Sequence, residues 1–351
     1  MTDRYDAAQL VDFAAALFSR SGLDADKARI CAEILVEGDL MGHTTHGLAL
    51  LGPYLDEAHS GKMLGTGAPE IVADAAASQT WDGRRLPGPW LTVRAAEWAT
   101  ARAKESGIAA VSIRRSCHIG CLAAYLQRFA AQGTMLVVTC SDPAVASVAP
   151  FGGTRRIFTP DPLAAGWPTP EGPVMIDVSM SITTNGLTNR LRAEGRAFEH
   201  PWLLDAEGRP TRDPNAFFTD PPGSLLPLGG VEAGHKGYGL ALLVEALTSA
   251  LGGYGRADAP TGWGASVFVM AIDPARFAGL PAFTRETGWM ADAVHANPAV
   301  PGGGPVRLPG ERALKLRAEH LANGVALHPS IPPALATRAV RAGIAAPQPL
   351  S

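Results

Sequence analysis

The chain has few cysteines and lacks long apolar runs. Its four cysteines in 351 residues have neither the density of a disulfide framework nor the paired spacing of a zinc site, so we interpret them as buried thiols of a reducing compartment and expect no metal. No stretch approaches the roughly 18 apolar residues that span a bilayer, and the first residues lack the apolar core of a signal peptide. These absences predict a cytoplasmic protein without a membrane partner.

The chain also lacks a strong excess of positive or negative charge. The formal net charge is -3, the isoelectric point is near 6.3, and no block of five or six basic residues occurs, which argues against a nucleic-acid partner. Hydrophobic residues make up 46% of the chain and charged residues only 18%. Such a chain can bury a large core, and its length favours two domains, or one domain with a second inserted.

Hydrophobic periodicity predicts helices at both ends and an α/β pattern between them. Helices are expected after the N-cap candidates Asp6 and Asp24 and around Leu48 to Leu55, where Pro53 marks a helix start or a kink. The polar stretch 185–227 is expected to run over the surface as a loop. Further on we expect strands at 108–113, 135–139, 174–178 and 267–272, helices at 119–131, 239–251, 310–322 and 332–342, and a loop at 298–309.

The glycines do not form a standard dinucleotide-binding turn. A Rossmann unit places Gly-x-Gly-x-x-Gly between a strand and a helix, with an acidic residue about 20 positions on. No glycine cluster of this chain has that context. Any dinucleotide would therefore bind to a fold of another type.

The first candidate site is the run from Gly38 to Gly47, which contains His43, Thr44, Thr45 and His46. One imidazole could act as a general acid or base with the neighbouring hydroxyl orienting it, because histidine titrates near working pH. Alternatively, a threonine caps the next helix and the histidines are solvated turn residues.

A second candidate follows the predicted strand 108–113. Arg114, Arg115, Cys117 and His118 lie at its carboxyl end, where α/β proteins place ligands. His118 would begin a helix, whose dipole lowers the pKa of an imidazole and suits a neutral hydrogen-bonding role. A histidine that caps the helix for local reasons fits equally well.

The run from Gly234 to Gly239 is a third candidate, because its glycines could turn amide groups toward a phosphate while Lys236 adds charge at a helix start. The alternative is close helix packing through the glycines. Asp142 and Asp177 end two predicted strands, and they either cap a turn or accept hydrogen bonds from ribose hydroxyls. Arg312 opens a late helix, where it either meets a phosphate or is solvated.

Taken together, these stretches resemble the malate and L-lactate dehydrogenase family, which includes ureidoglycolate, sulfolactate and diketogulonate enzymes and imine-reducing piperideine-2-carboxylate reductases. The similarity runs through separate motifs in the same order along nearly the whole chain: 39–54, 116–125, 149–153, 168–177, 208–214, 234–245 and 309–311. It implies a non-Rossmann α/β fold with a helical domain formed by both termini and a central cofactor-binding domain. The implied division is 1–115 with 290–351 for the helical, substrate-binding unit, and 116–289 for the cofactor unit.

The resemblance also implies an oxidoreductase that moves hydride between NAD(H) or NADP(H) and a 2-oxo acid, ketone or cyclic imine. Thr45 and His46 match the family's catalytic pair, and the histidine that His118 matches is the catalytic acid or base in some members. The family is homodimeric, and its cofactor lies near the subunit boundary. Further cofactor contacts are implied for His118, Ile119, Gly120, Cys121, Leu122, Asp142, Ile176, Asp177, Val178, His235, Lys236, Gly237, Glu311 and Arg312.

Three departures from the family pattern concern the substrate, for which Leu50 and Tyr54 are the expected contacts. Leu50 replaces the arginine that grips the substrate carboxylate, and Leu187 stands where a charged residue is common. The segment 160–162 reads Pro-Asp-Pro instead of Thr-Asn-Pro. Loss of the arginine removes a charge-assisted contact of about 1.5 to 3 kcal/mol. We therefore expect an atypical substrate or, alternatively, a binding protein or non-redox enzyme that has lost redox activity.

Overall fold

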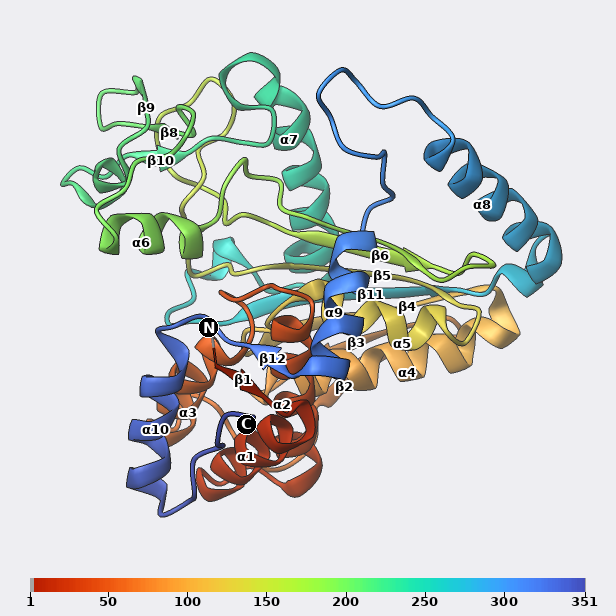
Figure 1. Ribbon diagram of the computed structural model, residues 1–351, viewed down its shortest axis with the longest axis horizontal. Helices are drawn as coiled ribbons and strands as arrows, with labels where there is room; N and C mark the ends of the chain where they lie inside the picture. The colour runs from red at the N-terminus through yellow and green to blue at the C-terminus, as the bar shows by residue number, and fades with distance from the viewer. Residues whose placement is uncertain (1–2, 351) are drawn as a thin grey trace.

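The computed structural model describes residues 3–350 and is built around one seven-stranded sheet that crosses the middle of the molecule (Figure 1). Every neighbouring pair is antiparallel except β3 and β4, which are parallel. Doubly wound folds have parallel sheets, so the prediction of a non-Rossmann α/β fold is confirmed. The strands lie in the order β2 (Glu70–Asp74), β3 (Ser78–Asp82), β4 (Ile108–Ser116), β11 (Ala265–Ile272), β5 (Met135–Ser141), β6 (Leu163–Trp167) and β7 (Val174–Val178).

Helices cover both faces of the sheet. In Figure 1, α4 (Gly88–Ser106) and α5 (Leu126–Ala130) lie below it and α7 (Gly230–Glu245) lies above it. The core contains the alanine-rich inner side of α4 packed on valines and isoleucines of the central strands. Helix α4 and strands β2 and β3 were not predicted, because α4 is buried over much of its circumference and β2 is wholly exposed. Neither gives a clear apolar period.

Both chain ends build a helical unit, as predicted. Helices α1 (Ala7–Arg20), α2 (Ala25–Leu40), α3 (Leu51–His59) and α10 (Ile331–Ala342) share one apolar cluster. Strands β1 (Arg4–Tyr5) and β12 (Val325–Ala326) pair antiparallel, and α9 (Glu311–Asn323) packs on α2. Pro53 lies in the first turn of α3, so it marks a helix start. No helix in residues 3–350 is long and apolar enough to cross a membrane.

Two regions are more ordered than the sequence suggests. The stretch 185–227, predicted as a loop, contains α6 (Asn185–Ala193) and a small sheet of β10 (Ser224–Leu225), β8 (Leu203–Leu204) and β9 (Pro210–Thr211). Buried Phe198, Leu203 and Phe217 give it a core of its own. The amphipathic helix α8 (Leu280–His295) was also not predicted.

Two helix boundaries differ from the prediction. Helix α7 begins at Gly230, not after Gly239, so Lys236 lies within the helix and not in a turn before it. The helix expected at 119–131 is a 3-10 turn at Leu122–Tyr125 followed by α5. The central sheet takes β2, β3 and β4 from one predicted domain and the other four strands from the second, so the division at residues 115 and 116 stays a prediction.

Candidate active site

Two histidines from distant parts of the chain lie side by side. His46 belongs to the loop after α2, and His118 follows β4, yet their ring centroids are 6.0 Å apart. Both side chains are half-buried. The sequence named each residue as a candidate, but only the tertiary structure brings the two together.

The loop that carries His46 is fixed by a buried carboxylate that the sequence reasoning missed. Asp39, on the last turn of α2, accepts a hydrogen bond of 2.6 Å from the backbone N–H of Leu48. Burial raises the pKa of Asp39 to about 7. Gly47 leaves room for this contact, because a Cβ there would lie 2.4 Å from the Asp39 carboxylate. The glycine after His46 is therefore required by close approach, and it holds the loop in one path.

His46 is oriented by its neighbour. The hydroxyl oxygen of Thr45 lies 2.8 Å from His46 Nδ1, which leaves Nε2 as the ring atom available for proton exchange. Burial lowers the pKa of His46 below its ordinary value of 6.5, the negative charge of Asp177 opposes that shift, and His43 adds to it. A neutral His46 is thus favoured at neutral pH, in the state that can accept a proton.

His118 is held as a neutral hydrogen-bond donor. The backbone N–H of Gly120 donates to His118 Nδ1 at 3.2 Å, and the Tyr54 hydroxyl lies 2.8 Å from the same nitrogen. An amide can only donate, so Nδ1 is an acceptor and the ring proton lies on Nε2. Trp263 stacks on the ring at a centroid distance of 4.7 Å.

Burial and the nearby His46 lower the pKa of His118 to about 3. The predicted direction of this shift is confirmed, but its cause was wrong. His118 does not begin a helix, since the next helical residue is Leu122. Desolvation, and not a helix dipole, keeps the ring neutral.

The two expected substrate contacts lie at different depths. Tyr54 is completely buried, and its hydroxyl reaches both the ring and the backbone oxygen of His118. Its visible role is to position His118. Leu50 is half-buried and packs against the apolar cluster of the helical unit, so this position offers a substrate no charge.

Strand β7 joins two of the predicted cofactor segments. Asp177 accepts a hydrogen bond of 2.9 Å from the backbone N–H of Ala123, and the Cys121 thiol lies 3.8 Å from the same carboxylate oxygen. Donor atoms of His43, Cys121 and Asp177 all lie within 4.8 Å of one another. Burial raises the pKa of Cys121 well above its usual range, so this group donates to Asp177 as a neutral thiol.

The start of α9 also reaches β7. Gly310 has φ +89°, and a Cβ there would lie 2.9 Å from the backbone oxygen of Met175. Glycine therefore allows α9 to begin directly beside the strand that carries Ile176, Asp177 and Val178. Glu311 and Arg312 follow at once, and Glu311 also contacts His295.

Asp142 and the predicted basic residues after β4 have structural partners. Asp142 accepts hydrogen bonds from the amides of Ala144 and Gly264, which fits the turn-capping alternative. Arg114 and Arg115 both pair with the fully buried Asp82, at 3.0 Å from Arg114 Nε and 2.9 Å from Arg115 Nε. This pairing makes the two arginines a structural pair across the β3 and β4 ends.

The glycines around Lys236 serve close packing in a helix. A Cβ at Gly237 would lie 2.5 Å from the backbone of Leu228, and one at Gly234 would lie 3.0 Å from the Phe151 ring. The packing alternative therefore holds for these two glycines. His235 and Lys236 are exposed on α7, and no contact recorded within residues 3–350 joins Lys236 to the histidine pair.

The geometry defines an α/β protein in which two half-buried histidines from distant segments lie side by side. Residues 5–336 match the family described as malate/L-lactate dehydrogenase. The chain is 32% identical to an L-lactate dehydrogenase of Cupriavidus necator, over 84% of this chain and 85% of that one. It is equally similar to a (2R)-3-sulfolactate dehydrogenase (NADP(+)) of Chromohalobacter salexigens, over 87% and 89%. A solved Escherichia coli structure, a putative malate/lactate dehydrogenase, superposes with a TM-score of 0.87 at 29% identity over 97% and 96%.

The chain belongs to the malate/L-lactate dehydrogenase family. The predicted resemblance, fold class and oxidoreductase activity are thereby confirmed, as is the nicotinamide class of cofactor.

Proposed function

We propose that the protein transfers hydride between NAD(P)H and a 2-oxo acid, ketone or cyclic imine, with His46 exchanging the proton. The observation that carries this proposal is a pair of adjacent, neutral imidazoles with different hydrogen-bond partners. His46 contacts Thr45, and burial lowers its pKa against the opposing charge of Asp177, whereas the Gly120 amide holds His118 as a neutral donor. The ring proton of His118 is held on Nε2 by the Gly120 amide, whereas His46 has a ring nitrogen free for proton exchange.

The residues divide the work accordingly. His46 Nε2 would give a proton to the substrate oxygen or nitrogen during reduction and take it back during oxidation. His118 Nε2–H would stabilise the negative charge that develops on the same atom, because a fixed donor needs no reorganisation. The cofactor, when bound, supplies the hydride, and the protein supplies position and charge.

Residues around the histidines fit a nicotinamide group. Asn185 begins α6, beside Gly186, whose Cβ would lie 3.5 Å from Thr45. The Asn185 side-chain oxygen is buried and has no hydrogen-bond partner within residues 3–350. A buried acceptor without a donor is costly, and a carboxamide N–H would satisfy it. We propose Asn185, with Asp177 and the start of α9, as contacts of the cofactor.

We also propose a homodimer that uses α7. Leu240, Leu242 and Leu243 are 44%, 46% and 49% exposed, which is more apolar surface than a solvated helix usually presents. Lys236 lies on the same side as Leu240 and Leu243, by the spacing i, i+4 and i+7. A partner seated on this face would bring Lys236 to the subunit boundary, where the resemblance places the cofactor.

Fluorescence titration with NADH and with NADPH tests the proposed function. We expect one of them to bind, and the Lys236→Ala variant to bind it more weakly. If neither binds, the reductase proposal fails and the alternative of a family member without redox activity takes its place.

Four free, buried cysteines support the proposed cytoplasmic location.

A further inference from the structure

An arginine on α6 reaches the loop that carries the proposed acid. Arg190 Nη1 donates to the Thr44 hydroxyl at 3.1 Å, and Nη2 donates to the Thr44 backbone oxygen at 3.4 Å. Thr44 directly precedes the Thr45 and His46 pair. Because Gly186 also packs on Thr45, α6 lies along this loop, and Arg190 places a positive charge next to it.

The charge of Arg190 is not neutralised by a carboxylate. Among the ion pairs of residues 3–350, Asp82 pairs with Arg114 and Arg115, but none of the pairs includes Arg190. The residue is half-buried, and its two recorded partners are neutral oxygen atoms. A guanidinium has five N–H donors, so Arg190 retains donors and an uncompensated charge beside the catalytic loop.

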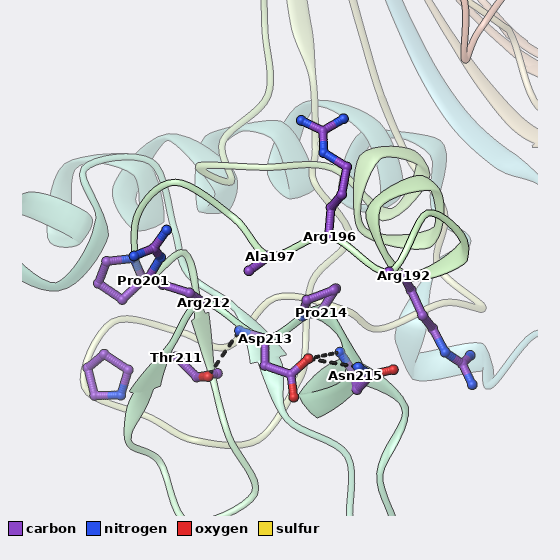
Figure 2. Close-up of a pocket in the computed structure, with 11 residues that line it drawn as sticks. Arg192, Arg196, Ala197, Pro201, Thr211, Arg212, Asp213, Pro214 and Asn215 are labelled. Atoms are coloured by element: carbon purple, nitrogen blue, oxygen red, sulfur yellow. Dashed lines mark hydrogen bonds between the residues drawn. The ribbon is translucent and has the colours of Figure 1, made fainter.

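Other arginines of the same region do not share this arrangement. Arg192, Arg196 and Arg212 line a cavity of about 810 Å³ beyond the C-terminal end of α6. Figure 2 shows their side chains pointing in different directions, so their charges do not converge. Arg192 instead lies over the Phe218 ring, at 4.1 Å from the centroid. Arg190 is thus distinguished from its neighbours by its contact with the loop.

We propose that Arg190 recognises the carboxylate, or an equivalent anionic group, of the substrate. This inference rests on the proposed function and names the substrate class, an anionic 2-oxo acid or cyclic imino acid. Leu187 lies one turn before Arg190 on the same side of α6, and Leu50 offers no charge. Arg190 therefore supplies, from another position, the cation that positions 50 and 187 lack in this chain. Its planar fork suits a carboxylate.

Oxamate and oxamide provide matched probes, because they have similar shapes and only oxamate is an anion. Calorimetric titration of each into the full-length protein, with and without NADH, is the measurement. We expect the wild type to bind oxamate more tightly than oxamide. Arg190→Leu should weaken the affinity for oxamate by about 10- to 100-fold and change the affinity for oxamide little. Arg190→Lys keeps the charge without the fork and should give an intermediate loss. Arg192→Leu is the matched control on the same helix, and it should leave both affinities unchanged.

Three results would overturn the proposal. The first is a wild type that does not bind oxamate, and the second is a wild type that binds oxamate and oxamide with equal affinity. The third is an Arg190→Leu variant whose affinities for both probes fall equally, because that would indicate a purely structural role. If Arg190→Leu does not fold, Arg190→Lys provides the test. Oxamate affinity equal to that of the wild type, with the same preference over oxamide, would show that the guanidinium fork is not used and would count against the proposal. The NADH titration without probe is read separately, so failure of cofactor binding is distinguished from failure at Arg190.

Discussion

Replacing each histidine by glutamine separates the roles of His46 and His118. Glutamine offers an amide N–H donor but cannot exchange a proton at working pH. His118 has a pKa near 3 and accepts at Nδ1 from Gly120, so its proposed use is as a donor through Nε2. Its function should survive this replacement, whereas that of His46 should not.

The expected magnitudes follow from these roles. His46→Gln should lower kcat by about 10²- to 10⁴-fold, which is the usual contribution of a general acid or base. His118→Gln should cost less than about 10-fold, and His118→Ala about 10- to 100-fold, the value of one hydrogen bond to a developing charge. Loss of nicotinamide absorbance under saturating substrate measures kcat, and exposed His200 gives the control His200→Gln. A larger loss in His118→Gln than in His46→Gln would refute the assignment.

Two further predictions concern pH and assembly. Because burial lowers the pKa of His46 below 6.5, the protonated form needed for reduction grows only as pH falls through that region. The reductive kcat should therefore rise below pH 6.5 while the oxidative kcat is flat above it, and a reductive optimum on the alkaline side would contradict this. Leu243→Lys on α7 should shift the mass measured by light scattering from dimer to monomer, whereas Leu321→Lys on α9, at a residue 51% exposed, should not. An unchanged mass in both variants would remove α7 from the interface.

Local sequence pattern predicts some residues of the site but not the contacts between them. The run around His46 is predicted from glycines beside titratable side chains, which indicate a tight approach of the backbone, and His118 from its place at the end of a predicted strand. The contacts that give these residues their states were not found. Tyr54 is 64 residues from His118 and Arg190 is 146 residues from Thr44, and no local spacing reports contacts across such separations.

The run around Lys236 shows the opposite case. Three glycines beside a lysine predicted a turn, yet α7 continues through them because Leu228 and Phe151 approach closely. Packing of this kind outweighs the cost of placing glycine in a helix, which is only about 1 kcal/mol per residue relative to alanine.

The sequence by itself determined the α/β class, the helices at both ends and the identity of the two histidines, because apolar period and residue chemistry are local properties. The tertiary structure decided which candidates meet. It paired His46 with His118, committed Arg114 and Arg115 to Asp82, and placed Arg190 beside the loop that carries His46. The physical reason is that pKa shifts and ion pairs depend on burial and on neighbours supplied by other segments, which exist only once the sheet and helices have packed.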